Sequence, residues 1–187
     1  MGKLRITAGS LKGRNITILD EGSARYTSGK VREAIFNIIG DIEGRRILDL
    51  FAGTGSFTIE AISRGAASAT CVEKDRRMAA NLKQNLMNLS IDKDCLVLNM
   101  DVRYAVPFLY KGGHNYDIIF ADPPYEKGLV TETVTLLKDN PVYENGAVFI
   151  VESSKRETAD LTTSDRWQGM TTRQYGDTVV SLFRFVI

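Results

Sequence analysis

The feature that most constrains the fold is a regular alternation of apolar runs with segments that suit helices, beginning at Arg46. The apolar runs are RILDLF, SATCVEK, CLVLNMD, YDIIFAD and GAVFIVE, and several of them end in an acidic residue. Between them, helices are predicted over roughly residues 56–64, 76–89, 102–109 and 128–138. Strands that are apolar throughout and alternate with helices indicate a parallel sheet covered on both faces.

Both ends of the chain depart from this alternation. MTTRQYG and TVVSLFRFVI are strand-like and are separated only by Gly176-Asp177, so we expect an antiparallel hairpin at an edge of the sheet. KLRITAG and GRNITIL, joined by SLKG, predict a second hairpin at the N-terminus. A helix is predicted to follow it, with Ser28 as N-cap and an apolar stripe that leaves Lys30, Arg32 and Asn37 outside. We therefore expect an extension over residues 1–40 and a single compact domain over residues 41–187.

The net charge of +1 hides an uneven distribution of charged residues. Residues 1–32 carry seven basic and two acidic side chains, a net +5, which leaves −4 for the rest of the chain. A basic arm on a mildly acidic body predicts that a polyanion docks at one end. A solvated N-terminal extension with no partner is the alternative that composition leaves open.

The cysteine and histidine residues limit which catalytic and metal sites this chain can form. Cys71 and Cys95 lie in apolar runs, as buried reduced thiols would, which suits the cytosol. No apolar segment is long enough for a signal peptide or a membrane span, so we expect a cytoplasmic protein without membrane association. His114 is the single histidine, so neither a histidine-based triad nor a multi-histidine metal site is expected, and no metal is predicted.

Polar residues follow three successive predicted strands, where an open parallel sheet binds its ligands. Asp49 ends the first strand, and Gly53-Thr54-Gly55 turns the chain into a helix. Thr58 stands where a dinucleotide fingerprint has its third glycine, and no P-loop lysine follows. Glu73 comes after the second strand, where a carboxylate meets ribose hydroxyls, and Asp101 comes after the third, near a possible adenine edge. Helix N-caps are the alternative reading of both acids.

The fourth strand runs into Asp122-Pro-Pro-Tyr125, and the prolines must end it. The Asp122 carboxylate and the Pro123 carbonyl can accept hydrogen bonds from an amino group, and Tyr125 offers a face for stacking a base. Such acceptors would orient the lone pair of a weakly nucleophilic amine. A proline-rich turn with Asp122 bonded to its own backbone is the alternative.

With a Gly-x-Gly loop after the first strand and an acid after the second, Asp-Pro-Pro-Tyr resembles S-adenosylmethionine-dependent methyltransferases that act on exocyclic amino groups. RITAGSLKGR, TSGKVREAIFN and LDLFAGTGSFTIEAISRGA are similar to the bacterial small-subunit (16S) rRNA guanine-N2 methyltransferases, over essentially the whole chain. Tyr26 and Gly29-Lys30 depart from that family's usual residues. The resemblance implies a Rossmann-like class I methyltransferase fold with a mainly parallel seven-stranded sheet.

The resemblance also implies roles for individual residues. The catalytic residues would be Asp122, Pro123 and Tyr125. S-adenosylmethionine would be bound by Asp49, Phe51, Gly53, Gly55, Glu73, Lys74, Asp101, Val102 and Asp122. The RNA would be held by Arg5, Lys12, Arg14, Ser28, Lys30 and Arg32.

The implied function is methyl transfer to N2 of a guanine in 16S rRNA, by a monomer that acts on an assembled or partly assembled small subunit, with ribosomal proteins in place. Three alternatives remain at this point. The same chemistry could modify adenine N6 or another amino group in RNA or DNA. A nicotinamide-dependent oxidoreductase could use a similar sheet, and an RNA-binding assembly factor could retain the pocket without activity.

Overall fold

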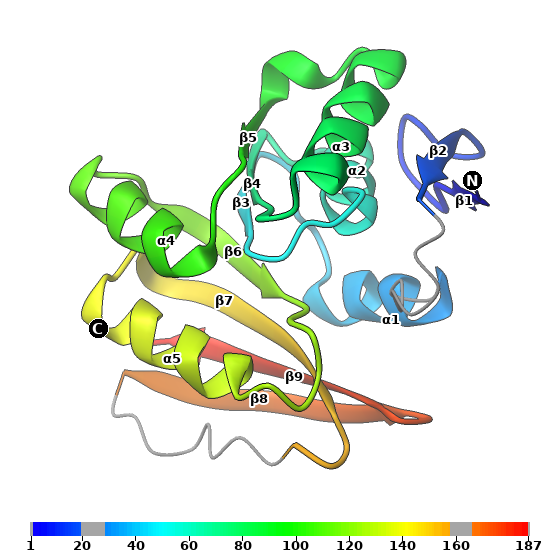
Figure 1. The fold of residues 1–187 in the computed structure, drawn as a ribbon. Helices are drawn as coiled ribbons and strands as arrows, with labels where there is room; N and C mark the ends of the chain where they lie inside the picture. The colour runs from blue at the N-terminus through cyan, green and yellow to red at the C-terminus, as the bar shows by residue number, and fades with distance from the viewer. Residues whose placement is uncertain (1, 20–28, 158–165, 187) are drawn as a thin grey trace.

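The computed structural model describes residues 2–19, 29–157 and 166–186. A two-stranded hairpin lies beside a seven-stranded sheet that has helices on both faces (Figure 1). The strands are β1 (Gly2–Arg5), β2 (Asn15–Ile18), β3 (Arg46–Asp49), β4 (Ser68–Val72), β5 (Cys95–Leu98), β6 (Tyr116–Ala121), β7 (Tyr143–Ser154), β8 (Trp167–Tyr175) and β9 (Thr178–Phe185). The helices are α1 (Gly29–Ile39), α2 (Ser56–Ser63), α3 (Arg76–Leu89), the 3-10 turn η1 (Asp92–Asp94), α4 (Val102–Lys111) and α5 (Leu129–Asp139).

The order of the large sheet is β5-β4-β3-β6-β7-β9-β8. The pairs from β5 to β7 are parallel, whereas β9 is antiparallel to both β7 and β8. The turn between β8 and β9 is the predicted Gly176-Asp177 pair, with Gly176 at a φ of 63°. The sequence-based prediction of a mainly parallel sheet with an antiparallel C-terminal hairpin is confirmed. Strand order reverses at β3, which pairs with β4 on one side and β6 on the other, so ligands are expected at the carboxyl ends of these strands.

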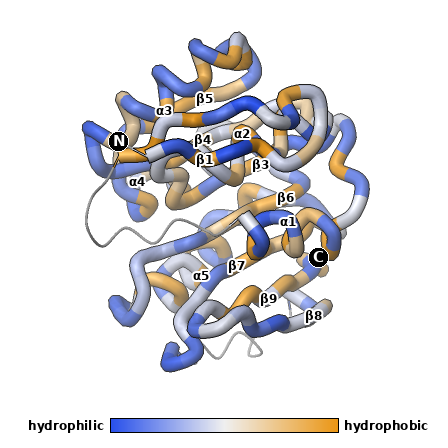
Figure 2. The backbone as a smooth tube through the Cα atoms, turned by 90° about the vertical axis from the view of Figure 1, so that its right-hand side faces the viewer, coloured by the Kyte–Doolittle hydropathy of each residue, from blue (hydrophilic) through white to orange (hydrophobic). Residues whose placement is uncertain are grey.

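Alternate residues of the central strands supply two cores, one on each face of the sheet. Ile47 and Phe120 point into the core under α1, α2 and α3, where Phe36, Phe57 and Phe120 stack with centroid separations of 5.0 and 3.9 Å. The neighbouring residues in the strands point into the second core, under α4 and α5. Figure 2 shows hydrophobic stretches along strands such as β6 and β7. Two covered faces explain why the strand sequences are apolar throughout.

The N-terminal hairpin packs against the outer side of α2 and α3. The strands β1 and β2 pair antiparallel, and Ile6 and Ile16 belong to the same core as α2 and α3. Gly9 fits closely against Ser63, because a Cβ at this glycine would lie 1.7 Å from the Ser63 carbonyl oxygen. Within the described residues, no helix has the length and apolar character of a membrane span. The division of the chain at residue 40 stays a prediction.

Candidate active site

A cavity of about 700 Å³ opens at the carboxyl ends of β3, β4, β5 and β6. It collects most of the residues that the sequence analysis selected from four separate strand ends. Its lining includes Asp49, Phe51, Gly53, Glu73, Lys74, Asp101, Val102, Asp122, Pro123 and Tyr125. A volume of 300–1,000 Å³ is usual for a small-molecule or cofactor site.

The two glycines of the loop after β3 have different structural roles. Both have positive φ angles, 54° at Gly53 and 84° at Gly55. A Cβ at Gly53 would meet no described atom nearer than Met78 Cε at 4.0 Å, so this glycine faces the open cavity. A Cβ at Gly55 would lie 2.2 Å from Leu82 Cδ1, so this glycine lets α3 pack against the loop. In the described part of the chain, Gly55 is not among the cavity-lining residues, and its predicted cofactor contact has no support from the geometry.

Glu73 belongs to the rim of the cavity and is not a helix cap. Its Oε2 accepts a 2.8 Å hydrogen bond from the Gly53 N–H, and its Oε1 accepts one of 2.7 Å from the Asp75 N–H. Asp75 caps α3 by accepting from the N–H groups of Arg77 and Met78. The N-cap alternative for Glu73 is therefore wrong, and its carboxylate joins the loops after β3 and β4.

Asp101 caps a helix and also lines the cavity. Its side chain accepts from the Arg103 N–H at 3.0 Å, which caps α4, and both of its oxygens accept 2.8 Å bonds from the Arg103 guanidinium. The hydrogen bond from the Arg103 side chain is the main reason why the pKa of Asp101 falls to about 2. Asp101 is thus a fixed negative charge beside Val102 at the end of β5.

Asp49 is the most deeply buried acid of the site, with 1 % of its surface exposed. Its Oδ2 accepts a 2.8 Å hydrogen bond from Thr58 Oγ1, whereas Oδ1 is buried and has no hydrogen-bond partner among the described residues. The pKa of Asp49 is raised to about 7, mainly by burial, and the nearby charges of Asp122 and Glu73 contribute to this rise. The charges of Asp122 and Glu73, with Asp49 only partly ionised near neutral pH, make a negative potential that suits a cationic ligand such as a sulfonium with an amino group.

The loop that follows β6 is held by the C-terminal strands. Pro123 is buried, and Asp122 and Tyr125 are half-buried against the cavity. The Tyr125 hydroxyl lies 3.1 Å from Thr178 Oγ1, at the first residue of β9. Glu126 follows with a φ of 60°, and its N–H donates to Glu157 at 3.2 Å. The proline-rich segment is therefore tied to a distant part of the chain and is more than a local turn.

Sequence reasoning missed several residues that line the cavity, including Met78, Arg103, Arg156 and Asp177. Arg103 could have been found from the sequence, since it lies two residues after the Asp101 cap. Asp177 belongs to the β8–β9 turn. The sequence correctly predicted a hairpin turn at this residue but did not predict that the turn borders the cavity. Arg156 lies just beyond β7, and its position along the chain did not indicate that it would reach the cavity.

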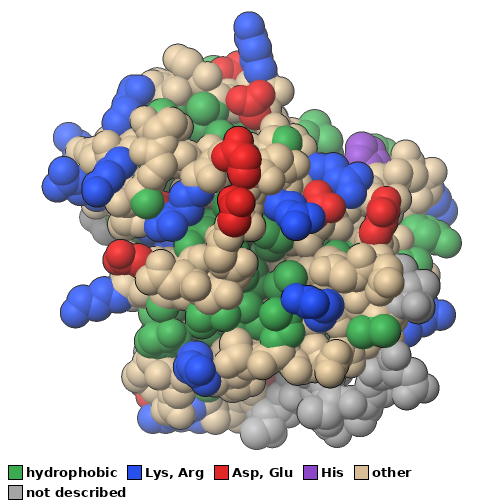
Figure 3. Space-filling model, turned by 180° about the vertical axis from the view of Figure 1, so that it is seen from behind, with side chains coloured by type: hydrophobic (Ala, Val, Ile, Leu, Met, Phe, Trp, Pro, Cys, Tyr) green, Lys and Arg blue, Asp and Glu red, His purple; other side chains and the backbone are tan. Residues whose placement is uncertain are grey.

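The predicted RNA-binding side chains lie mainly on the hairpin, and none of those in the described ranges lines the cavity. Arg5, Lys12, Arg14 and Lys30 are exposed. Arg14 donates a 3.0 Å hydrogen bond to the Asn88 carbonyl at the end of α3. Seen from behind in Figure 3, Lys and Arg side chains gather at the edge of the molecule that the hairpin occupies. The predicted contribution of Ser28 lies outside the described residues.

Arg32 corrects the sequence-based interpretation, because it is not on the surface. It has 0 % of its area exposed, its Nη2 donates to the Arg5 carbonyl at 3.0 Å, and its Nε lies 3.4 Å from Glu60 Oε2. Its charge is compensated by Glu60, a buried acid on α2. The spacing of apolar residues in α1 gives no indication of this partner. Direct phosphate binding by Arg32 is therefore wrong.

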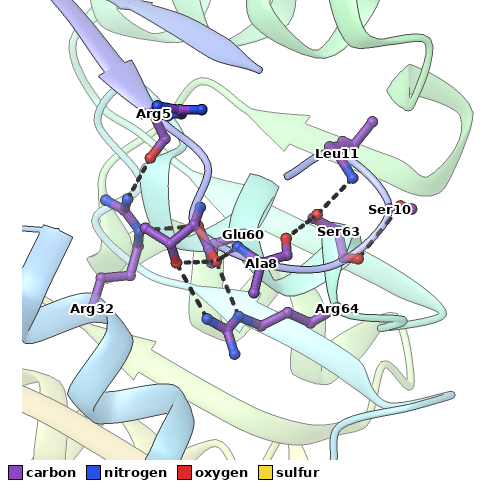
Figure 4. A network of polar contacts seen from close by, with 9 residues as sticks. Arg5, Ala8, Ser10, Leu11, Arg32, Glu60, Ser63 and Arg64 are labelled. Carbon is purple, nitrogen blue, oxygen red and sulfur yellow. Dashed lines mark hydrogen bonds and ion pairs between the residues drawn. The ribbon is translucent and has the colours of Figure 1, made fainter. Parts of the chain in front are cut away.

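Glu60 is the centre of the contacts that seat the hairpin (Figure 4). Its carboxylate accepts from the Thr7 N–H at 2.9 Å, the Thr7 hydroxyl at 2.6 Å, the Ala8 N–H at 3.0 Å and Arg64 Nε at 3.0 Å. Burial alone would raise the pKa of Glu60, but the hydrogen bonds from Thr7 and the charges of Arg32 and Arg64 outweigh it and leave that pKa below its usual value.

A sheet in this order, with a glycine loop after β3, an acid after β4 and Asp-Pro-Pro-Tyr after β6 around one cavity, defines a class I S-adenosylmethionine-dependent methyltransferase. Within that class, the family described as Conserved hypothetical protein 95 matches residues 4–184, and the chain belongs to this family.

Curated relatives and a solved structure agree with this assignment. The chain is 39 % identical over 153 residues to Ribosomal RNA small subunit methyltransferase D of Escherichia coli strain K12, covering 81 % of this chain and 75 % of that protein. It is 33 % identical to YlbH of Bacillus subtilis, over 97 % of this chain and 98 % of that protein. The solved structure of yhhF from Escherichia coli superposes with a TM-score of 0.87 at 33 % identity, over 100 % of this chain and 99 % of that one.

Proposed function

We propose that this enzyme transfers the methyl group of S-adenosylmethionine to the exocyclic N2 of a guanine in small-subunit (16S) rRNA. The observation that carries the proposal is that Asp122, Pro123 and Tyr125 line the same cavity as Glu73 and Asp101. Groups suited to an amine and groups suited to a nucleoside cofactor therefore lie within reach of one another. The name of the Escherichia coli relative supports small-subunit rRNA as the substrate class.

The cofactor supplies an electrophilic methyl group on a positively charged sulfur. In this proposal, the Glu73 carboxylate accepts hydrogen bonds from ribose hydroxyls, as acids at this strand position do. Asp101 and the peptide at Val102 border the adenine. Asp122 stabilises the cationic end of the cofactor through its negative charge, and the bound cation would favour the ionised form of Asp49 and so lower its pKa from about 7. Phe51 and Lys74 complete the walls.

The acceptor loop would prepare the amine for attack. The Asp122 carboxylate and the Pro123 carbonyl accept hydrogen bonds from the two N–H groups of guanine N2, which directs the nitrogen lone pair toward the methyl carbon. The amine becomes cationic and acidic as it is alkylated, so its proton can leave to Asp122 or to water without prior deprotonation. The Tyr125 ring provides a stacking surface, and its hydroxyl contact with Thr178 limits rotation of that ring.

The hairpin would dock the RNA. Arg5, Lys12, Arg14 and Lys30 are exposed cations outside the cavity, which suits contacts with phosphates and not with the reacting base. The target guanine must leave its stack to reach Asp122, so a loop or single-stranded segment is the proposed target. A monomer acting in the cytoplasm on an assembled or partly assembled subunit is the simplest form of this proposal.

The deciding experiment is incubation with labelled methyl donor and small subunits that lack the modification, followed by nucleoside analysis. Label on N2-methylguanosine is the expected result, and naked 16S rRNA in a parallel reaction tests the need for assembly. Label on N6-methyladenosine would overturn the substrate assignment. Cofactor binding with no transfer to subunits or rRNA would overturn the proposed function.

A further inference from the structure

Asn85, in the middle of α3, joins two segments that are far apart in the sequence. Its side chain is 2 % exposed. Its Oδ1 accepts a 3.0 Å hydrogen bond from the Thr17 N–H in β2. Its Nδ2 donates to the Thr17 carbonyl at 2.9 Å and to the Thr54 carbonyl at 3.1 Å. One amide therefore contacts both polar backbone groups of a hairpin residue and a carbonyl of the cofactor loop.

The contact with Thr54 fixes the plane of a peptide in the cofactor loop. The Thr54 carbonyl and the Gly55 N–H belong to the same planar peptide group. Asn85 holds the carbonyl end of that group, and the Gly55 N–H donates a 2.7 Å bond to the Ala52 carbonyl at the other end. The Ala52 carbonyl and the Gly53 N–H belong to one further planar peptide group, so the bond from Gly55 also helps to keep the Gly53 N–H directed toward Glu73.

The contact with Thr17 determines which way the amide faces. A neutral amide has distinct donor and acceptor ends, and only one orientation satisfies the N–H and the carbonyl of the same residue. With Oδ1 directed at the Thr17 N–H, Nδ2 is left to reach Thr54. An aspartate at this position would place a carboxylate against two carbonyl oxygens, and an aliphatic residue would leave those oxygens unsatisfied.

We propose that Asn85 is a positioning residue for cofactor binding, which holds the Thr54–Gly55 peptide in its binding geometry while the backbone of the hairpin holds Asn85. The residue acts through the loop and touches neither methyl donor nor RNA. The part of the hairpin that matters for this role is Thr17 in β2, and not the segment around Ala8 and Leu11 that Ser63 holds. The inference concerns cofactor affinity and stands whichever nucleotide the enzyme modifies.

The test compares Asn85→Asp and the smaller change Asn85→Ala with Ser63→Ala. Ser63 anchors the same hairpin through the Leu11 N–H and the Ala8 carbonyl but has no contact with the loop, so its variant is the matched control for a loosened hairpin. Calorimetric titration with S-adenosylhomocysteine, well below the lowest melting temperature, should give a Kd raised about tenfold or more in the Asn85 variants. The Kd of Ser63→Ala should stay within about twofold of the wild type.

Two further measurements separate positioning from a general loss of stability. KM for S-adenosylmethionine should rise in the Asn85 variants while kcat at saturating donor changes less than about threefold. In the unliganded wild-type protein, the Gly55 amide should exchange with solvent slowly for a loop amide, and the Asn85→Ala change should accelerate it selectively. Lower melting temperatures with an unchanged Kd, or a freely exchanging Gly55 amide in the wild type, would overturn the proposal.

Discussion

The Gly53 N–H donates a 2.8 Å hydrogen bond to Oε2 of Glu73, so the glycine loop after β3 and the acid after β4 form one continuous rim of the cavity. Glu73→Ala would remove this acceptor together with the carboxylate proposed for the ribose. A hydrogen bond to a charged group is worth about 1.5–3 kcal/mol, so we expect the Kd for S-adenosylhomocysteine to rise about 10- to 100-fold. Calorimetric titration measures it, with Glu73→Gln as the milder control. An unchanged Kd would remove Glu73 from the cofactor site.

Asp122→Ala should affect methyl transfer far more than folding. Loss of a preorganised hydrogen-bonding group of this kind costs about 10²–10³ in rate. Single-turnover methylation of small subunits measures the loss, and circular dichroism with thermal melting tests whether the fold is retained. Asp122→Asn keeps one acceptor oxygen and should fall between the alanine variant and the wild type. Normal turnover by the alanine variant would contradict the proposed role of this carboxylate.

Asp49 should make the stability of the unliganded protein depend on pH. Its pKa is about 7 in the folded state, so the folded state binds the proton more tightly than the unfolded chain does, whose aspartates titrate near 3.9. The free energy of unfolding should therefore fall as pH rises between these values, by at most about 4 kcal/mol at pH 8.

Asp49→Asn keeps an acceptor for Thr58 and removes the titration. Urea unfolding between pH 5 and pH 8 should show a smaller decline for this variant, and the variant should be more stable than the wild type at pH 8. Parallel pH profiles for the two proteins would show that the Asp49 carboxylate is not the cause.

Glu60→Gln should destabilise the seating of the hairpin, because it leaves the buried Arg32 without its counter-charge. Breaking a buried ion pair from one side costs about 3–5 kcal/mol. The pKa of Glu60 is lowered by folding, so its stabilisation is present above the pKa of the unfolded chain and is lost as pH falls through the folded-state value. The difference between variant and wild type should thus shrink in acid. Adding Arg32→Met to Glu60→Gln should recover stability at pH 7 in denaturant titrations, and failure to recover would argue against the ion pair.

Arg14→Ala and Lys30→Ala should weaken RNA binding and flatten its salt dependence. Each lost phosphate contact on a single strand lowers the slope of log K against log[salt] by about 0.7. Filter binding to small subunits at several salt concentrations measures the slope. Arg173→Ala, an exposed cation on β8, is the control and should leave the slope unchanged. Equal slopes for all of these proteins would place the docking surface elsewhere.

The elements whose signals are local were predictable from the sequence. The helix over Arg76–Leu89 matches its predicted range, and the β8–β9 turn falls at Gly176-Asp177 as expected. Glu73 and Asp101 were placed at the cavity because parallel strands end at one edge. Polar contacts between distant parts of the chain were not predictable. No local pattern around Arg32 indicates its ion pair with Glu60, and none around Tyr125 indicates its hydrogen bond with Thr178. The N-cap at Asp75 was missed because Glu73 and Asp75 both precede α3 closely, and the sequence does not show which of them caps the helix.

The anchoring of Tyr125 by Thr178 has a consequence for the order in which the enzyme is built. Strand β9 follows the other described strands along the chain, yet it inserts between β7 and β8 and carries the partner of the acceptor loop. During translation, the glycine loop and its acids are therefore made well before the strand that anchors Tyr125. A nascent chain would thus gain a place for the methyl donor before it gains a rigid place for the base.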